Sequence, residues 1–470
     1  MHQLQVNPYL TEKLYAPIEQ EIDGQELKPI EGKIPDDLNG AYIRNGPNPK
    51  YEPNGRYHWF DGDGMLHGVY FENGRAIYRN RYINTRGFKE EVKNGGPIWG
   101  GLLEDVRKNP SYEPLKNTSN TDVVFHGDSL LSLWYRAGEP YRIDAKTLET
   151  IGGETFNDQL TCNLSAHSKV DEKTGELIFF DYGNIYPYMM YGVTSKENEL
   201  KHLVPIDLPG PRLPHDMAIT ENYSILMDLP LFNDPESVKK GRYKVKFFRE
   251  LPSRFGILPR YGDNSQIRWF EASPCYIYHV VNAWEEGDEI VIIGCRVKEP
   301  VPSESKTDGP IERMLSFLRL DAQLHYWRFN LKTGKVREGE LCDRNSEFPT
   351  MNLHYAGRPS KYAYNVTIEN TLTLKFNGLV KYDLQTGSSQ THFFGEGRNG
   401  TEAAFAPRDN AVDEDDGYLV TYVYDELRDR SEVLIYDAKH FDIGPITVLE
   451  LPQRVPMGFH ATWVDGYKLK

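Results

Sequence analysis

Four histidines stand in short, distinct motifs that lie far apart in the chain. They are His167 in LSAHSKVD, His215 in LPHDMA, His279 in CYIYHVVNAWE and His460 in FHATW. A local zinc clip takes its ligands from a few neighbouring residues, so this wide spacing argues against one. Donors from distant segments instead fit a closed, repetitive fold whose strands converge on one axis. Because imidazole binds iron, zinc, copper and nickel, the four residues predict a metal site without naming the metal.

The segments around these histidines resemble the signatures of the carotenoid cleavage oxygenase family, which includes the lignostilbene dioxygenases. Two further segments near the N-terminus, IRNGPNP and HWFDGDGM, add to the resemblance, and all of them occur in the family's order. The resemblance implies an all-β fold, a seven-bladed β-propeller with a short helical and loop cap over the axial metal site. Residues 1–470 are then expected to form one propeller domain, with residues 1–29 as an N-terminal extension packed on it.

The same resemblance implies the ligands and the cofactor. Four histidines would hold Fe(II) and form the catalytic centre, with O2 as co-substrate: His167, His215, His279 and His460. The chain has 13 histidines, and two others, His58 and His67, lie close together in YHWFDGDGMLHGV. The resemblance does not make them ligands, and we interpret both as structural.

Carboxylates are expected behind the histidines, because a ligating imidazole usually donates its second N–H to an acceptor that fixes its orientation. The family uses three glutamates for this, and Glu347 in EFP and Glu402 in TEAAFAPR are the candidates for two of them. The third falls in WYRAGEPY, where Arg136 takes the glutamate position. Either the loop is shifted, so that Glu139 or a water serves, or one histidine lacks a carboxylate.

The activity implied by the resemblance is the splitting of a C=C double bond of a carotenoid or apocarotenoid by O2 into two carbonyl (aldehyde) products. Two alternatives are cleavage of a phenolic stilbene or phenylpropene, and a non-cleaving isomerase or lipid-binding member. Tyr135 and Phe348 are expected to line the substrate cavity, with ordinary packing as the alternative for both. In relatives that cleave phenolic substrates a lysine stands where Tyr135 stands here, which favours a lipophilic polyene as substrate. The alternative is that Arg136 replaces this lysine through a one-residue shift of the loop.

Composition excludes some partners. With 54 basic and 69 acidic residues the chain has a net charge of −15, so nucleic-acid binding is not expected. No apolar run reaches the roughly 18 residues of a membrane span, and the N-terminus lacks a signal-peptide pattern. We therefore expect a cytoplasmic protein with no obligate protein partner. The apolar segments 97–103 and 314–320 are candidates for a tunnel mouth in peripheral contact with a membrane, with core packing as the alternative.

Short β-prone runs separated by polar turns account for most of the chain. Examples are ELIFF, EIVIIGC and YLVTYVY, which mix β-branched and aromatic residues as strands do. Acidic residues followed by glycine between such runs are typical of tight hairpin turns, so antiparallel blades are expected. Spacing of apolar residues predicts only two short helices, in residues 97–109 and 309–321.

Overall fold

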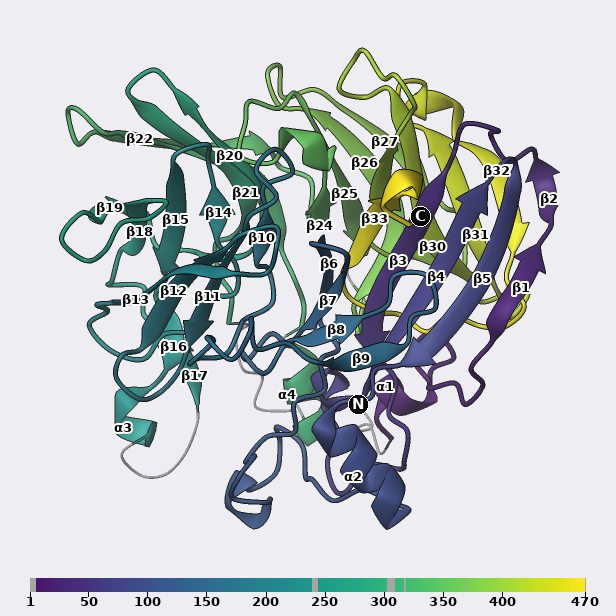
Figure 1. Cartoon of the computed structure of the whole chain (residues 1–470), viewed down its shortest axis with the longest axis horizontal. Helices are drawn as coiled ribbons and strands as arrows, with labels where there is room; N and C mark the ends of the chain where they lie inside the picture. Colours follow the sequence, from purple (N-terminus) through teal and green to yellow (C-terminus); the bar gives the residue numbers. More distant parts are fainter. Residues whose placement is uncertain (1–5, 239–243, 302–308, 317, 370, 470) are drawn as a thin grey trace.

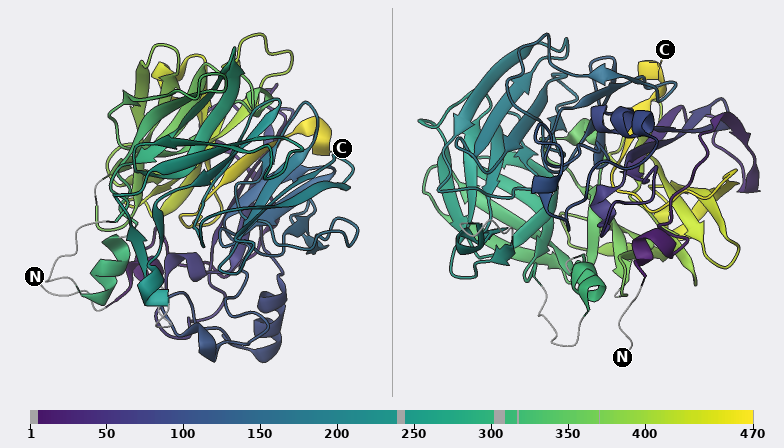
Figure 2. Two further views of the ribbon diagram at one scale, coloured as in Figure 1. Left: turned by 90° about the vertical axis from the view of Figure 1, so that its left-hand side faces the viewer. Right: turned by 90° about the horizontal axis from the view of Figure 1, so that it is seen from below.

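The computed structural model describes residues 6–238, 244–301, 309–316, 318–369 and 371–469. Within these residues, seven antiparallel sheets form the blades of a β-propeller, which confirms the predicted fold class. The view from below in Figure 2 shows the sheets arranged in a ring. Strands near the middle of a blade, such as β21 (Glu289–Val297), are buried along almost their whole length, because both faces of a blade pack on its neighbours.

The first three blades follow the chain, except that the first also takes the last strand. Blade 1 contains β1 (Asp23–Leu27), β5 (Arg75–Tyr82), β4 (Gly64–Glu72), β3 (Gly40–Pro47) and β33 (Ala461–Asp465). Blade 2 contains β6 (Asp122–His126), β7 (Ser129–Leu133), β8 (Tyr141–Ile143) and β9 (Thr150–Gly153). Blade 3 contains β10 (Lys169–Val170), β11 (Leu177–Tyr182), β12 (Met189–Thr194) and β13 (Leu200–Ile206).

The remaining blades keep the same antiparallel order. Blade 4 contains β14 (Ala218–Ile219), β15 (Tyr223–Asp228), β18 (Ser253–Pro259) and β19 (Arg268–Ala272), beside the small β16 (Leu231–Asn233) and β17 (Val245–Phe247) pair. Blade 5 contains β20 (Tyr276–Glu286), β21, β22 (Ala322–Asn330) and β23 (Val336–Cys342). Blade 6 contains β24 (Ser346–Thr350), β25 (Tyr362–Glu369), β26 (Lys375–Asp383) and β27 (Ser389–Phe393). Blade 7 contains β2 (Pro29–Gly32), β32 (Pro445–Glu450), β31 (Arg430–Asp437), β30 (Gly417–Asp425), β28 (Arg398–Gly400) and β29 (Ala404–Pro407).

One strand of each blade lies innermost, against the corresponding strands of its neighbours. Strand β33 lies beside β6 and β29, β6 lies beside β10, and β20 lies beside β14 and β24. The ring is closed by both ends of the chain. Strand β33 pairs with β3 in blade 1, where Ala461 is opposite Arg44, and β2 pairs with β32 in blade 7. Closure therefore depends on pairings between the N-terminal and C-terminal parts of the sequence.

Helices gather on one side of the ring, where Figure 1 shows α1 (Pro8–Thr11), α2 (Arg86–Asn94) and α4 (Pro310–Ser316) together below the blades. A fourth short helix is α3 (Pro235–Val238). Of the helix predicted in 309–321, the structure confirms the part formed by α4. Phe317 lies outside the described residues. None of the helices in the described ranges is long and apolar enough to cross a bilayer.

The helix predicted in residues 97–109 was wrong. Helix α2 lies earlier, begins after Thr85, whose side chain accepts the Phe88 N–H, and ends at Gly95 in the left-handed conformation. Residues 97–105 are irregular apart from a turn and bend at 102–104, and only Val106–Lys108 make a short 3-10 turn. The physical reason is the glycine pair at 100–101, which weakens a helix despite the apolar spacing around it.

Candidate metal centre

The four histidines singled out from the sequence lie at the inner strands of four blades. His167 lies two residues before β10 and His215 three residues before β14, His279 lies in β20, and His460 immediately precedes β33. Since inner strands of neighbouring blades lie side by side around the axis, residues far apart in the chain are brought to one place. The wide sequence spacing is thus a consequence of the blade repeat.

The imidazole rings form a compact group. The ring centre of His460 lies 4.5 Å from those of both His167 and His279, which are 4.9 Å apart. One ring nitrogen from each of these three residues lies within 4.8 Å of the others. His215 is placed beside them, with its ring centre 4.8 Å from His167 and 5.2 Å from His279. The structure thus brings all four predicted residues together.

The donor chemistry of the group fits a divalent metal ion. Burial lowers the pKa of His167, His215 and His279, so these rings are neutral and can offer a lone pair. The Nε2 atoms of His167 and His279 are buried and have no hydrogen-bond partner among the described residues. A buried polar atom without a partner is costly, and a metal ion shared by the rings would satisfy both atoms.

Two carboxylates, those of the predicted residues Glu347 and Glu402, contact the Nδ1 atoms of His279 and His460. Glu347 Oε2 lies 2.5 Å from His279 Nδ1, and Glu402 Oε1 lies 3.3 Å from His460 Nδ1. Both carboxylates are buried, and burial raises the pKa of Glu347 to about 8. For His460, burial works toward a lower pKa, but the nearby carboxylates, Glu402 foremost, raise it above its usual value.

Neither residue considered for the third carboxylate position is placed among the histidines. Arg136 acts electrostatically on Asp61 and Tyr135, and Glu139 is exposed, with its side chain near Tyr141. A different acid, Asp122 in β6, has Oδ2 only 3.4 Å from His167 Nδ1. The sequence analysis missed it, although an acid that opens a β-prone run (TDVVFH) is a signal that could have found it.

An apolar cavity meets the histidine group on the side of the cap. Its wall includes Phe348 and Tyr135, the two residues expected to line a substrate cavity, together with Trp59, Phe60, Leu318, Leu320, Leu374 and Phe459. The Phe348 ring stacks on His460 at 4.9 Å between centres. Of the apolar segments considered for a membrane contact, the second therefore contributes two leucines to this cavity.

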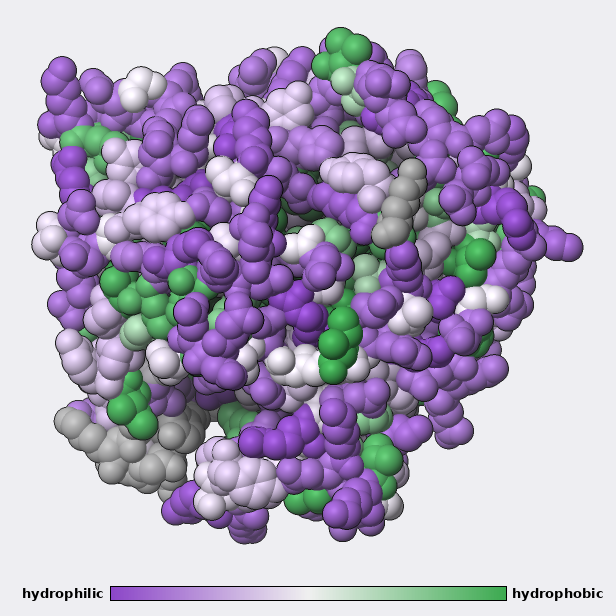
Figure 3. Space-filling view, in the orientation of Figure 1, coloured by the Kyte–Doolittle hydropathy of each residue, from purple (hydrophilic) through white to green (hydrophobic). Residues whose placement is uncertain are grey.

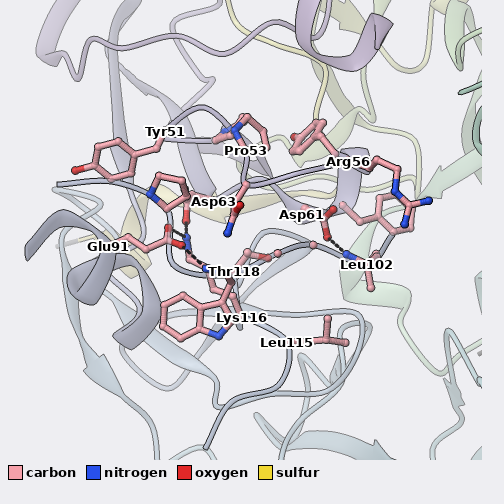
Figure 4. Close-up of a pocket in the computed structure, with 18 of the residues that line it drawn as sticks. Tyr51, Pro53, Arg56, Asp61, Asp63, Glu91, Leu102, Leu115, Lys116 and Thr118 are labelled. Atoms are coloured by element: carbon pink, nitrogen blue, oxygen red, sulfur yellow. Dashed lines mark hydrogen bonds and ion pairs between the residues drawn. The ribbon is translucent and has the colours of Figure 1, made fainter. Parts of the chain in front are cut away.

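A second cavity lies next to the apolar one, and Phe60 and Tyr135 line both. Figure 4 shows its polar wall, in which Lys116 lies between Asp63 and Glu91 at 2.5 Å from each carboxylate.

The opposite side of the histidine group faces another cavity, along the axis of the propeller. It is lined by His167, His279 and His460 and by the ion pair of Lys169 with Asp216, whose atoms are 2.7 Å apart. This ion pair joins the segments that carry His167 and His215. The group therefore lies between an apolar space and a more polar one.

The histidines interpreted as structural have local roles. His58 Nδ1 accepts the Phe60 N–H at 3.1 Å and caps a short 3-10 turn. His67 Nδ1 lies 2.9 Å from the Tyr78 hydroxyl. His58 thus stabilises the backbone of the cavity wall, and His67 stabilises side-chain packing in blade 1.

Comparison with known proteins agrees with this geometry. A family model described as "Retinal pigment epithelial membrane protein" matches residues 15–465. A carotenoid 9,10(9',10')-cleavage dioxygenase of Crocus sativus is 39% identical over 492 residues, covering 97% of this chain and 89% of that protein. A carotenoid cleavage oxygenase of Mycobacterium tuberculosis is 31% identical and covers 97% of each chain.

Solved structures of oxygenases are also similar to this chain. The crystal structure of Pseudomonas brassicacearum lignostilbene dioxygenase matches with a TM-score of 0.88 and 29% identity, covering 99% of this chain and 100% of that one. Cobalt-substituted Synechocystis ACO matches with a TM-score of 0.85 and 27% identity, over 97% of this chain and 98% of that one. The fold and the site thus define a β-propeller enzyme of the oxygenase class. The chain belongs to the retinal pigment epithelial membrane protein family, that of the carotenoid cleavage oxygenases.

Proposed function

We propose that the protein is an Fe(II)-dependent dioxygenase that cleaves a C=C double bond of a carotenoid or apocarotenoid with O2 to give two carbonyl products. One observation supports this above all: unpartnered imidazole nitrogens converge on the propeller axis where an apolar cavity ends. The names of the plant relatives, 38–39% identical, favour the 9,10(9',10') double bonds.

The proposed ligands are His167, His215, His279 and His460. Four neutral imidazoles would leave the ion its full charge, and bound Fe(II) would supply the activation of O2. Glu347 and Glu402 would hold the rings of His279 and His460 in the ligating tautomer. The protein otherwise has to bind and orient the substrate and to exclude water, and no general base is needed for this.

The proposed substrate is a lipophilic polyene. Its binding energy would come almost entirely from apolar burial, about 25 cal/mol for each Å² removed from water. The aromatic wall of Phe60, Tyr135, Phe348 and Phe459 supplies such a surface next to the histidines. Phe348 stacks on His460, so it would define how closely a double bond approaches the metal.

We propose a cytoplasmic location with peripheral membrane contact as the route of substrate supply. All four cysteines are free, which suits a reducing compartment. The surface seen in Figure 3 is mainly hydrophilic, with apolar side chains in small groups.

The proposed function predicts oxygen-dependent product formation. Protein reconstituted with ferrous iron and supplied with β-carotene or a long apocarotenal is expected to yield two carbonyl fragments in air and none under nitrogen, as followed by chromatography and mass spectrometry. Metal-free protein is the matched control. Isomerised substrate without carbonyl fragments, formed equally with and without O2, would contradict the proposal and favour a non-cleaving member of the family.

Glu347→Gln and Glu402→Gln are expected to weaken iron binding or turnover by about 10–100-fold each, the usual loss when a partner of a ligating histidine is removed. The amide keeps the size of the carboxylate but removes its charge. Iron retained against a chelator and kcat/KM with an apocarotenal are the measurements.

Glu414→Gln is the control for these two variants. Glu414 is a partly buried carboxylate that accepts the Lys361 and Tyr362 N–H groups, and the structure places it away from the histidines. If both variants retain iron and turn over as the control does, the two glutamates do not support the centre.

A further inference from the structure

Six of the seven blades contribute a side chain to the metal centre from the innermost strand or the residues just before it. Blades 1, 3, 4 and 5 contribute the four histidines. Blade 6 contributes Glu347 in β24, and blade 7 contributes Glu402 just before β29. Blade 2 is left, and Asp122 is the first residue of its inner strand, β6. The blade repeat therefore puts Asp122 at the equivalent place.

Asp122 is placed at His167 much as Glu402 is placed at His460. Its Oδ2 lies 3.4 Å from His167 Nδ1 and accepts the His167 backbone N–H at 3.0 Å. Glu402 has one oxygen 3.3 Å from His460 Nδ1, and its other oxygen accepts the N–H of Ala461. In both cases one buried carboxylate lies near the ring Nδ1 and accepts a backbone N–H at the ligand or next to it.

The contact between Asp122 and the His167 N–H stabilises an unusual backbone conformation of His167. His167 has a φ of +64°, in the left-handed region that residues other than glycine rarely occupy. Such a conformation costs about 1–3 kcal/mol and persists only where its surroundings hold it. Asp122 Oδ2 accepts the N–H of this residue, and both residues are more than nine-tenths buried.

We propose that Asp122 is the third carboxylate of the centre: a positioning residue that fixes the tautomer and orientation of His167. The inference rests on the proposed metal site. The side chain of Asp122 is shorter than glutamate, and its position at the start of β6, directly beside β10, lets it span the distance to His167.

Asp122→Asn tests the proposal with Co²⁺ as the probe, so that the readout does not depend on turnover. An amide has a single acceptor oxygen, and it cannot serve Val123 N–H, as Oδ1 does at 2.8 Å, together with both contacts to His167. The variant is expected to bind Co²⁺ about 10–100-fold more weakly than the unmodified protein. Its visible cobalt absorption is expected to change in position and intensity, because the His167 ring is no longer held.

Asp415→Asn is the matched control. Asp415 is equally buried but is paired with Lys381 at 2.6 Å, away from the histidines. Its Co²⁺ affinity and spectrum are expected to stay within twofold of the unmodified protein. A folded Asp122→Asn protein that behaves like this control would overturn the assignment. If the unmodified protein binds no Co²⁺, the proposed metal site itself is wrong, which is a distinct outcome.

The unmodified cobalt protein provides a test that does not depend on a variant folding. Proton NMR is expected to show three slowly exchanging, metal-shifted imidazole N–H signals, one each for the rings held by Asp122, Glu347 and Glu402. Only two such signals would overturn the role of Asp122, because the His167 N–H would then exchange freely with water.

Discussion

His279→Ala is expected to abolish iron binding and to lower kcat/KM for an apocarotenal by at least about 1,000-fold. The loss exceeds the 10–100-fold typical of a residue behind a ligand, because a donor is removed from the middle of the group. The His279 ring lies within about 5 Å of the other imidazoles, between two cavities. Iron content by elemental analysis and steady-state kinetics are the measurements, and His167, His215 and His460 are expected to behave alike.

His58→Ala is the control, because His58 is partly buried near the cavity wall but only caps a turn. It is expected to keep roughly one iron per chain. The ligand assignment would be wrong if His279→Ala retained iron and activity, or if the unmodified protein bound zinc through a different set of residues and showed no iron-dependent turnover.

The second large effect is expected in the choice of substrate. β-Carotene or a long apocarotenal is expected to be cleaved with a kcat/KM at least about 100-fold above that of resveratrol or isoeugenol. An ionised phenol buried without a positive partner is costly, and Tyr135 carries no charge at the position where the resemblance places a lysine in stilbene-cleaving relatives. Arg136, which acts electrostatically on Tyr135, is the alternative cation. The Tyr135 ring packs at 5.1 Å from Phe60 in the cavity wall.

Variants at Tyr135 separate the contributions of charge and shape. Tyr135→Lys is expected to raise turnover of the phenolic substrates relative to the polyene, whereas Tyr135→Phe is expected to leave polyene turnover nearly unchanged. The backbone here is held by the Thr121 hydroxyl and the Tyr182 hydroxyl, so the site tolerates both changes. Equal or faster cleavage of the phenols by the unmodified protein would reverse the choice of substrate and leave the iron assignment intact.

The residues of the proposed centre could be singled out from the sequence because they are embedded in long motifs. Residues such as His215 and His460 could be singled out only through their neighbours, since a lone histidine is seldom a ligand. The blade count followed from the resemblance, as the repeats are too divergent to be counted directly. Strand-rich runs such as 289–297 were evident because β-branched residues on both faces are typical of a strand packed between two layers.

Asp122 could not be predicted from spacing within one loop, the Tyr135–Glu139 segment. The requirement on an outer carboxylate is spatial: its oxygen must reach His167 Nδ1, and any inner strand beside β10 can supply it. Pairing between neighbouring blades cannot be inferred from the local pattern. The helix predicted in 97–109 does not form, because the glycine pair at 100–101 outweighs the apolar spacing around it.

The closure of the ring has a thermodynamic consequence for the metal. His460 immediately precedes β33, the strand that completes blade 1 against β3, whereas His167, His215 and His279 come from blades 3 to 5. An ion bound to all four rings therefore links the last strand of the chain to the opposite side of the propeller. Opening the ring then costs the ion's binding free energy as well as the β33 pairing, about 2.7 kcal/mol at an ion concentration 100 times its Kd. Loss of iron would weaken the closure between the two ends of the chain first and leave the individual blades intact.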